Sequence, residues 1–480
     1  MERLSIASAA RRGLVLPVHA GRVRAGIVHL GIGAFARAHT AVLTDAAMSA
    51  TGDDRWGIVG VSQRSATVPE QLGPQDGLFT VTSRSAASTV TEVVASVVRA
   101  VAAQGAPDEV AAAIASPETR VVTLTITEKG YHLGGDGDLD VASPAVRADL
   151  AGARSTAIGQ LAAGIAARDG APLTVLSCDN LPGNGRLLAR ALASFADALG
   201  GAAGSRLSSA LSRSIRFPDT MVDRMVPATT DADREAVARR LGLGDDAAVV
   251  AEPYLQWVIA DDFAAERPAW ERAGAQFVAD VAPWEGAKLR ILNASHSLLA
   301  YLGLLSGAVT VAQAVAVPEW RTAIRRLVDD DVLPSLELPA GMHGDEYRDA
   351  VIERFGNPHL GHTVAKVGAD GSQKIGPRIG ATIRAARARG REPRAAALAV
   401  AAWAAYLRRA DPATVDDPRR DEVTAAASGA APGEGGLRVL ELIAPDLAAD
   451  AVVADLLRGW SRVIERAGVS GVKEELRGQQ

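Results

Sequence analysis

The sequence lacks several features that would each indicate a particular class of protein. It contains a single cysteine, Cys178, which excludes an intrachain disulfide and any zinc or iron-sulfur site built from several cysteines. It also lacks a long block of one charge sign, because 51 basic and 56 acidic residues are intermixed and give a net charge of −5. We therefore expect no nucleic-acid partner, and a small-molecule partner is favoured.

Long apolar runs are absent as well. The longest, residues 395–407, falls short of the roughly 20 residues that span a bilayer, so we expect a buried helix there and no membrane partner. Residues 1–26 mix arginines with short apolar stretches and lack the continuous apolar region of a signal peptide. These absences predict a cytoplasmic protein.

What the sequence does contain is typical of a two-domain α/β protein. Its 480 residues are enough for two or three domains. In the first half, short β-rich runs alternate with helical stretches such as 34–49 and 107–115, which predicts a doubly wound parallel sheet. Residues 78–94 alternate as an inserted hairpin would. The candidate strands are residues 27–31, 57–62, 120–126 and 173–178.

The second half has a different pattern from the first, because its apolar residues recur at the α-helical period. The clearest helical stretches are residues 285–305, 318–328, 394–409 and 448–467. We therefore predict a Rossmann-type dinucleotide-binding domain over residues 1–280 and a mainly α-helical substrate and catalytic domain over residues 281–480.

A glycine turn follows the first strand. Glycines permit a tight turn and a close approach of the backbone to a pyrophosphate, and the helix behind them presents free N–H groups. Ala36 replaces the third glycine of the usual motif, so an ordinary strand-to-helix turn is the alternative. The predicted cofactor contacts here are Gly31, Ile32, Gly33, Ala34 and Phe35.

The second strand ends in Ser62, Gln63 and Arg64, where an acidic residue would select NAD and an arginine can accommodate the phosphate of NADP. No carboxylate stands there, and Arg64 is either a cofactor contact or an ordinary solvated residue. The residues alone leave the choice between NAD and NADP open.

A second group of chemically capable side chains begins a helix after Pro283. At α-helical spacing, Glu285, Lys288, Asn293 and His296 fall within an arc of about 140°. A lysine shielded from water can act as acid when a ketone is reduced, while an amide and an imidazole polarise the oxygen. The alternative is an exposed Glu285–Lys288 pair beside a partly buried histidine.

A resemblance to a known family decides between these alternatives. The segments that carry it are residues 31–39, 125–131, 177–182, 217–224, 252–257, 288–296 and 370–374, in this order over most of the chain. They resemble the polyol-specific long-chain dehydrogenases. The resemblance implies NAD as the leading cofactor, a metal-independent reaction and a sugar-derived ketone or secondary alcohol as substrate.

The resemblance also assigns residues. It implies that Lys288 is the general acid and base, that Asn184 and Asn293 hold the reacting oxygen, and that Glu285 relays the proton. It further implies that His296 orients the substrate and that Asp223 and Lys374 contact its hydroxyl groups. Asn184 and Asp223 have an alternative as a helix cap and a turn residue.

Departures from the family pattern bear on the substrate. Lys366 occupies a position that looks like an arginine in the mannitol-oxidising members of the family. Lys129 occupies a position where those members usually carry a second glycine. A cationic side chain can neutralise a substrate carboxylate. We therefore expect reduction of D-fructuronate to D-mannonate, with interconversion of D-mannitol and D-fructose as the alternative.

Two other classes compete with this interpretation. A non-catalytic nucleotide or sugar sensor would keep the glycines but would have no use for the lysine, amide and imidazole on one helix. A metal-dependent alcohol dehydrogenase would need ligands, for which His343, His359 and His362 are the candidates, but they lack a zinc-binding spacing and we expect no metal. The sequence leaves the oligomeric state open, and a monomer is compatible with it.

Overall fold

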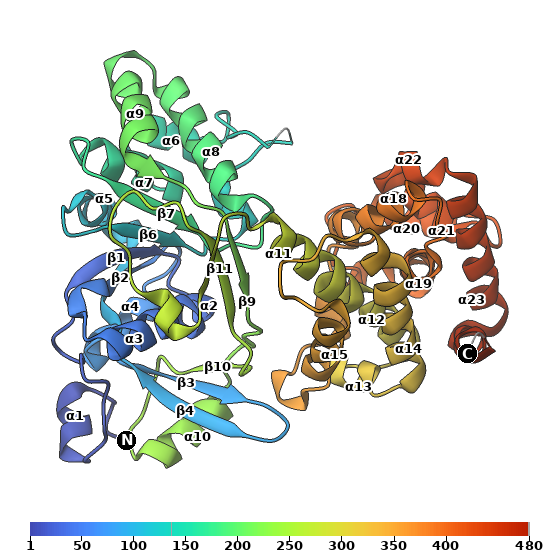
Figure 1. Cartoon of the computed structure of the whole chain (residues 1–480), viewed down its shortest axis with the longest axis horizontal. Coiled ribbons are helices and arrows are strands. Elements are labelled where there is room, and N and C mark those ends of the chain that lie inside the picture. Colours follow the sequence, from blue (N-terminus) through green and yellow to red (C-terminus); the bar gives the residue numbers. More distant parts are fainter. Residues whose placement is uncertain (136, 479–480) are drawn as a thin grey trace. The chain divides into compact units, whose positions relative to one another are not determined.

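A six-stranded sheet organises Met1–Ala282, the first of two units in the computed structural model, which describes residues 1–135 and 137–478 (Figure 1). All neighbouring strands run parallel. In spatial order they are β5 (Val97–Ala102), β2 (Gly57–Ser62), β1 (Ala25–Leu30), β6 (Val121–Leu124), β7 (Leu173–Ser177) and β8 (Ile215–Arg216). Numbered within this sheet, the order is 3-2-1-4-5-6, that of a doubly wound dinucleotide-binding fold. The predicted fold class is confirmed.

Helices cover both faces of this sheet, which explains why its strands read as apolar runs without alternation. Ile27 packs on one face against α3 (Thr40–Thr51), while Val28 and Leu30 pack on the other with α5 (Pro107–Ala115) and α7 (Ala157–Ala166). The remaining helices of this unit are α1 (Ile6–Arg11), α2 (Ala34–Ala38), α4 (Thr67–Leu72), α6 (Pro144–Leu150), α8 (Asn184–Leu199), α9 (Gly201–Ser214) and α10 (Asp231–Leu241).

Two small sheets accompany the main one. The expected hairpin is present as β3 (Phe79–Arg84) and β4 (Thr89–Val94), and β10 (Val249–Ala251) pairs with β3. The second sheet contains β9 (Thr220–Asp223), β11 (Gln256–Ala260) and β12 (Gln276–Val278). Strands of three to five residues are too short for their periodicity to be read from the sequence.

The helix expected over residues 34–49 is divided in two. His39 leaves helical geometry, with φ −120° and ψ −85°, and separates α2 from α3. Its ring stacks on Phe35 with centroids 5.0 Å apart, and its Nε2 lies 2.9 Å from the carbonyl oxygen of Gln256. These contacts to β11 outweigh the local helical pattern.

The second unit, Pro283–Gln480, is built from helices over its described residues, as predicted. Its central helix is α19 (Arg394–Arg409), which is buried over most of its length and contacts α12, α21 and α23. The α-helices are α11 (Ala282–Ala287), α12 (Ala294–Leu305), α13 (Val311–Val315), α14 (Pro318–Arg326), α15 (Gly344–Phe355), α16 (Val364–Gly368), α17 (Gly371–Ile375), α18 (Ala381–Arg387), α20 (Arg420–Ser428), α21 (Gly435–Ile443), α22 (Pro445–Ala448) and α23 (Ala451–Gly478).

Three helical predictions for this unit differ from the structure in detail. The helix expected over residues 318–328 ends at Arg326, after which a π-helix begins. The helix expected over residues 448–467 begins at Ala451, after α22 has ended, and α23 bends at Gly468, whose φ of 58° is not helical. The continuous helix expected over residues 285–305 contains a π-helix, η6 (Lys288–Asn293), between α11 and α12. Two further π-helices are η7 (Leu327–Val332) and η10 (Gly376–Gly380).

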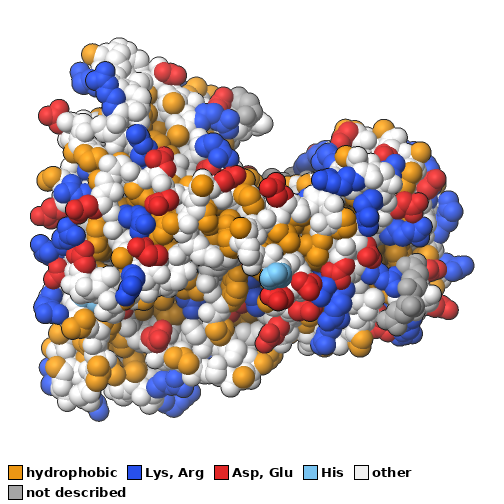
Figure 2. Space-filling view, viewed as in Figure 1, with side chains coloured by type: hydrophobic (Ala, Val, Ile, Leu, Met, Phe, Trp, Pro, Cys, Tyr) orange, Lys and Arg blue, Asp and Glu red, His pale blue; other side chains and the backbone are white. Residues whose placement is uncertain are grey.

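The surface of each unit carries both charge signs. Figure 2 shows acidic and basic side chains intermixed on the visible face. Among residues 1–135 and 137–478, no helix has the length and apolar character that crossing a bilayer requires.

Asp331 links two helices at the centre of the second unit. This buried carboxylate in η7 accepts a hydrogen bond of 2.7 Å from the backbone N–H of Ala396, in the first turn of α19. Burial raises its pKa to about 7, although the bonds from the N–H groups of Ala396 and Ala395 act in the opposite direction. The carboxyl group is therefore protonated in the folded chain at pH values where it ionises in the unfolded chain.

This raised pKa predicts a loss of stability with rising pH. The contribution of Asp331 is fully present below its ordinary pKa of 3.8 and is lost as the pH rises through about 7. Asp331→Asn keeps an acceptor for Ala396 but cannot ionise. Between pH 4 and pH 8 the wild type should lose up to about 4 kcal/mol of unfolding free energy relative to this variant. Urea unfolding of both proteins at several pH values measures the difference, and parallel pH profiles would contradict the assignment.

Candidate active site

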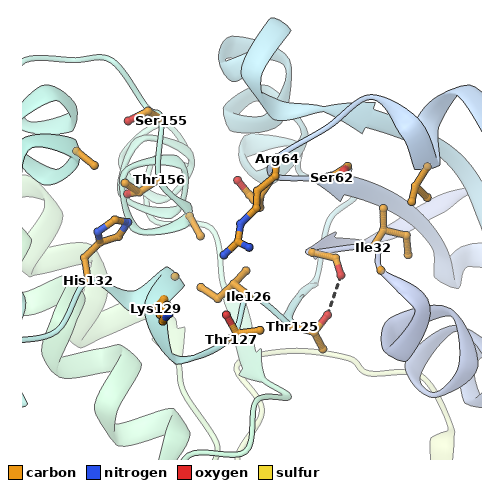
Figure 3. A pocket seen from close by; sticks show the side chains of 17 residues that line it. Ile32, Ser62, Arg64, Thr125, Ile126, Thr127, Lys129, His132, Ser155 and Thr156 are labelled. Atoms are coloured by element: carbon orange, nitrogen blue, oxygen red, sulfur yellow. Dashed lines mark hydrogen bonds between the residues drawn. The ribbon is translucent and has the colours of Figure 1, made fainter. Parts of the chain in front are cut away.

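A pocket of about 530 Å³ opens at the carboxyl ends of β1, β2 and β6 in the first unit (Figure 3). The strands β2 and β6 flank β1 on opposite sides, so this is the point where the strand order reverses and where doubly wound sheets bind ligands. The pocket is lined by Gly31, Ile32, Gly33, Ser62, Gln63, Arg64, Val68, Thr125, Ile126, Thr127, Lys129, Gly130, His132, Ala145, Ser155, Thr156 and Ala157.

The glycine turn fixes one wall of this pocket. Gly31 has a φ of +101°, and a Cβ added there would lie 2.2 Å from the carbonyl oxygen of Thr125, so no side chain fits. The Thr125 hydroxyl in turn donates a hydrogen bond of 2.7 Å to the carbonyl oxygen of Gly31. Gly33 differs, because a Cβ there would meet nothing closer than 3.8 Å. Its lack of a side chain leaves space in the pocket.

The predicted cofactor residues divide into two groups. Gly31, Ile32, Gly33 and Arg64 line the pocket. Ala34 and Phe35 begin α2 and are not among the lining residues, because the turn directs the Phe35 ring onto His39. For all six residues the assignment as cofactor contacts stays a prediction.

The end of β2 is anchored by a pair of glutamines. The side-chain amides of Gln63 and Gln160 exchange two hydrogen bonds, of 2.9 and 3.1 Å, and Gln160 is fully buried in α7. Arg64 follows directly and is exposed. In the described part of the chain, neither Arg64 nor Lys129 has a hydrogen-bonded or ion-paired partner for its side chain.

Lys129 therefore lies in the pocket of the first unit, in the single-turn helix η4 (Glu128–Tyr131). The sequence predicted it to contact a substrate. Its neighbours in this pocket are the residues that the sequence assigned to the nucleotide.

Two other predicted substrate residues lie deeper in the first unit. The Asn184 amide is fully buried: it donates to the carbonyl oxygens of Asp179 and Thr220 at 3.1 and 2.9 Å, and its oxygen accepts from the Thr220 N–H at 2.9 Å. Asn184 thereby ties the segment after β7 to β9. Asp223 is the last residue of β9 and is 6% exposed.

The second unit places the predicted catalytic residues on one continuous helical stretch. Glu285 lies in α11, Lys288 begins η6 and Asn293 ends it. Lys288 is only 8% exposed, which excludes the freely solvated lysine that helical spacing alone allowed. In η6 the Ala294 N–H donates to the carbonyl oxygen of Leu289, five residues back. This wider winding brings Lys288 and Asn293 closer on one face than α-helical spacing does.

Asn293 and His296 keep polar atoms available. In the described part of the chain, the Asn293 side chain has no hydrogen-bond partner and the Nε2 atom of His296 is buried without one. The His296 ring stacks on Phe355 with centroids 4.5 Å apart, and burial holds its pKa well below the usual value. A neutral imidazole with an unsatisfied buried nitrogen can bond to a substrate hydroxyl group.

Cationic side chains surround this histidine. Positive charge at Lys374, Arg378 and Arg354 lowers its pKa further, and Lys366 does the same to Lys374. The Lys374 Nζ donates to the Ala369 carbonyl oxygen at 2.7 Å and lies 3.4 Å from Asp370, while Lys366 is exposed in α16. We call Arg354, Lys366, Lys374 and Arg378 the cationic group.

Arg378 was missed by the sequence analysis. It lies in η10 and donates to the Asn293 carbonyl oxygen at 3.5 Å and to the Ser297 hydroxyl at 3.1 Å, so it braces the helix that carries Asn293 and His296. A signal was present, because Arg378 follows Lys374 at the i, i+4 spacing of one helix face.

The candidate metal ligands are dispersed in the described part of the chain, where no three His, Cys, Asp or Glu side chains gather as a ligand set. His343 precedes α15, His359 lies in the short helix Pro358–Leu360, and His362 stacks near His296 with centroids 6.4 Å apart.

Family models match nearly the whole chain. A Mannitol dehydrogenase Rossmann domain covers residues 25–272, and a Mannitol dehydrogenase C-terminal domain covers residues 280–456. The chain belongs to the mannitol dehydrogenase family. The resemblance seen in the sequence is thereby confirmed, and the chain is an oxidoreductase of this family.

Individual members of the mannitol dehydrogenase family agree with this assignment. The chain is 39% identical to the D-mannonate oxidoreductase of Escherichia coli over 81% of both chains. It is 34% identical to a mannitol 2-dehydrogenase of Pyrenophora tritici-repentis over 94% of this chain and 82% of that protein. The ternary complex of Pseudomonas fluorescens mannitol 2-dehydrogenase with NAD and D-mannitol matches with a TM-score of 0.86 and 33% identity over the full length of both chains.

The two glycines of the turn should respond differently to substitution. Gly31→Ala places a Cβ against the Thr125 backbone at positive φ and should lower the free energy of unfolding by about 2 kcal/mol or more. Gly33→Ala fits the folded chain and should cost less than about 0.5 kcal/mol, yet it should weaken NADH binding about tenfold by keeping the pyrophosphate from the backbone.

Chemical unfolding and fluorescence titration of both variants measure these effects. Equal destabilisation by the two substitutions, or unchanged NADH affinity in Gly33→Ala, would show that the turn does not hold the nucleotide.

Proposed function

We propose that this chain interconverts a ketose or keto-uronate and the corresponding polyol or aldonate, with reduction of D-fructuronate to D-mannonate as the leading reaction. The observation that carries this proposal is the buried Lys288 on the same helical stretch as the free Asn293 amide and the His296 imidazole, with the cationic group beside them.

The first unit is suited to a nicotinamide dinucleotide. The pocket at the strand-order reversal has the volume of a small-molecule site, and the glycine turn lets a pyrophosphate approach the backbone. When bound there, NAD(H) supplies the hydride for reduction or accepts it in oxidation. Gly31, Ile32 and Gly33 would hold its pyrophosphate, and Arg64 lies at the strand end where the adenosine ribose would bind.

The second unit supplies the proton chemistry. In reduction the Lys288 ammonium gives a proton to the carbonyl oxygen of the substrate, and in oxidation the amine takes a proton from the alcohol. The Asn293 amide donates a hydrogen bond to the same oxygen and stabilises negative charge as it develops. Glu285, one turn before the lysine, exchanges the proton with water. Within the first unit, Asn184 holds the segment after β7 to β9.

The cationic group favours a substrate that carries a carboxylate. Positive charge on Arg354, Lys374 and Arg378 acts on His296, and Asp370 lies 3.4 Å from Lys374. A uronate brings a second negative charge, and charge-assisted hydrogen bonds to it are worth about 1.5–3 kcal/mol. A neutral ketose gains no such interaction. The E. coli relative named D-mannonate oxidoreductase supports the same choice.

Interconversion of D-mannitol and D-fructose is the second candidate. It is favoured by the full-length match to a mannitol 2-dehydrogenase that binds NAD and D-mannitol. Both reactions place the same demands on Lys288 and Asn293, so they differ only in what the cationic group contacts.

Replacing the lysine tests the chemistry common to both reactions. Lys288→Ala should lower kcat by a factor of about 10² to 10⁴ and leave the Kd of NADH unchanged, because the proton donor is lost but the pocket of the first unit is intact. Lys473→Ala is the matched control, since it removes a lysine of the same unit that lies over the Trp320 ring. Turnover retained by Lys288→Ala would refute the mechanism and leave a binding role.

A substrate comparison tests the leading reaction. With saturating NADH, we expect kcat/KM for D-fructuronate to exceed that for D-fructose by about tenfold or more, as one added charge-assisted contact implies. Lys366→Gln should reduce this preference without changing kcat/KM for D-fructose. A preference of the wild type for D-fructose would replace the uronate assignment with the mannitol one.

A further inference from the structure

The nucleotide pocket contains basic side chains but no acidic one among its lining residues. Arg64, Lys129 and His132 line it, together with serine and threonine hydroxyls. An NAD-selective pocket places a carboxylate at the end of the second strand, where it accepts hydrogen bonds from the adenosine ribose and repels a phosphate on that sugar. The pocket of this chain has neither the acceptor nor the repulsion.

The fold determines which residues lie at the end of the second strand, β2. The strand β2 neighbours β1 in register, so its carboxyl end, Ser62 to Arg64, lies next to the glycine turn that meets the pyrophosphate. The side-chain amide of Gln63 is hydrogen-bonded through both its nitrogen and its oxygen to Gln160. The Ser62 hydroxyl and the Arg64 guanidinium are the polar groups that remain for the ribose.

The Arg64 side chain is positioned to bind an anion in the pocket. Figure 3 shows its side chain extending from the end of β2 into the pocket, with Lys129 and His132 at the other side. Its guanidinium forms no ion pair with any residue in the described ranges 1–135 and 137–478, whereas Arg55, at the opposite end of β2, pairs with both Asp53 and Glu266. A guanidinium can bind a phosphate through two parallel hydrogen bonds.

We propose that this pocket accepts the 2′-phosphate of NADP(H) on Arg64, with the Ser62 hydroxyl as a second donor, so that the chain binds NADPH at least as tightly as NADH. The inference rests on the nucleotide site of the proposed function and adds the choice of cofactor. It does not depend on which sugar is reduced.

Equilibrium binding tests it without any sugar substrate. Fluorescence titration of the full-length wild type should give a Kd for NADPH no larger than that for NADH. Arg64→Ala should raise the Kd for NADPH about tenfold or more, because a bidentate charged contact is lost, and should change the Kd for NADH less than about threefold. Arg64 is exposed, so the variant should fold normally.

Two further variants make the assignment specific. Ser62→Asp restores a carboxylate at the strand end and should shift the preference to NADH. Lys129→Ala removes the neighbouring cation and should leave the NADPH preference in place. Adenosine 2′,5′-bisphosphate should displace NADPH more effectively than adenosine 5′-phosphate from the wild type, and this advantage should disappear in Arg64→Ala.

Three outcomes would overturn the inference. NADH could bind the wild type about tenfold more tightly than NADPH, Arg64→Ala could weaken both nucleotides equally, or Lys129→Ala could lose the NADPH preference in place of Arg64→Ala. The first two leave the proposed oxidoreductase intact with NADH as cofactor. Failure of both nucleotides to bind would contradict the proposed function itself.

Discussion

The close approach of Gly31 to Thr125 is the constraint on which the nucleotide half of this protein depends. The chain leaves β1 at positive φ and passes within van der Waals contact of the backbone after β6, where no side chain can be accommodated. The approach joins the ends of the two strands at which the sheet reverses its order, and it leaves the crevice above them open. Both glycines of that turn line the pocket.

The proposed proton chemistry of the second unit depends on a different feature, the π-helix η6. A regular α-helix turns about 100° per residue, so residues five apart lie about 140° apart around its axis. The i to i+5 winding of η6 reduces this angle and brings an amine and an amide to the same side. Arg378, from a second π-helix, bonds to the carbonyl oxygen at the end of η6 and to the following turn. Two irregular helical segments thus support each other around His296.

The sequence predicted the architecture because the patterns involved are long or have strong end signals. The strand 57–62 and the helices 107–115 and 394–409 match the structure residue for residue, since apolar periodicity and flanking Pro or Gly residues define them. The break at His39 and the three π-helices were not predictable, because they arise from contacts with residues distant in the sequence. The same reason explains the candidate site: Lys288, Asn293 and His296 follow from one segment, whereas Phe355 and Arg378 reach it only through tertiary packing. Asn184 is a different case: the resemblance implies that it holds the reacting oxygen, which stays a prediction, and the structure adds that its amide joins two backbone segments, which no sequence pattern indicated.

The mutual amide bonds of Gln63 and Gln160 have a consequence for how this pocket can diverge. A substitution of Gln63 leaves the fully buried amide of Gln160 unsatisfied and loosens the contact between the end of β2 and α7. The residues at positions 62 and 64, on either side of Gln63, take no part in this amide pair. Substitutions at positions 62 and 64 therefore leave this amide pair intact, whereas a substitution at position 63 breaks it.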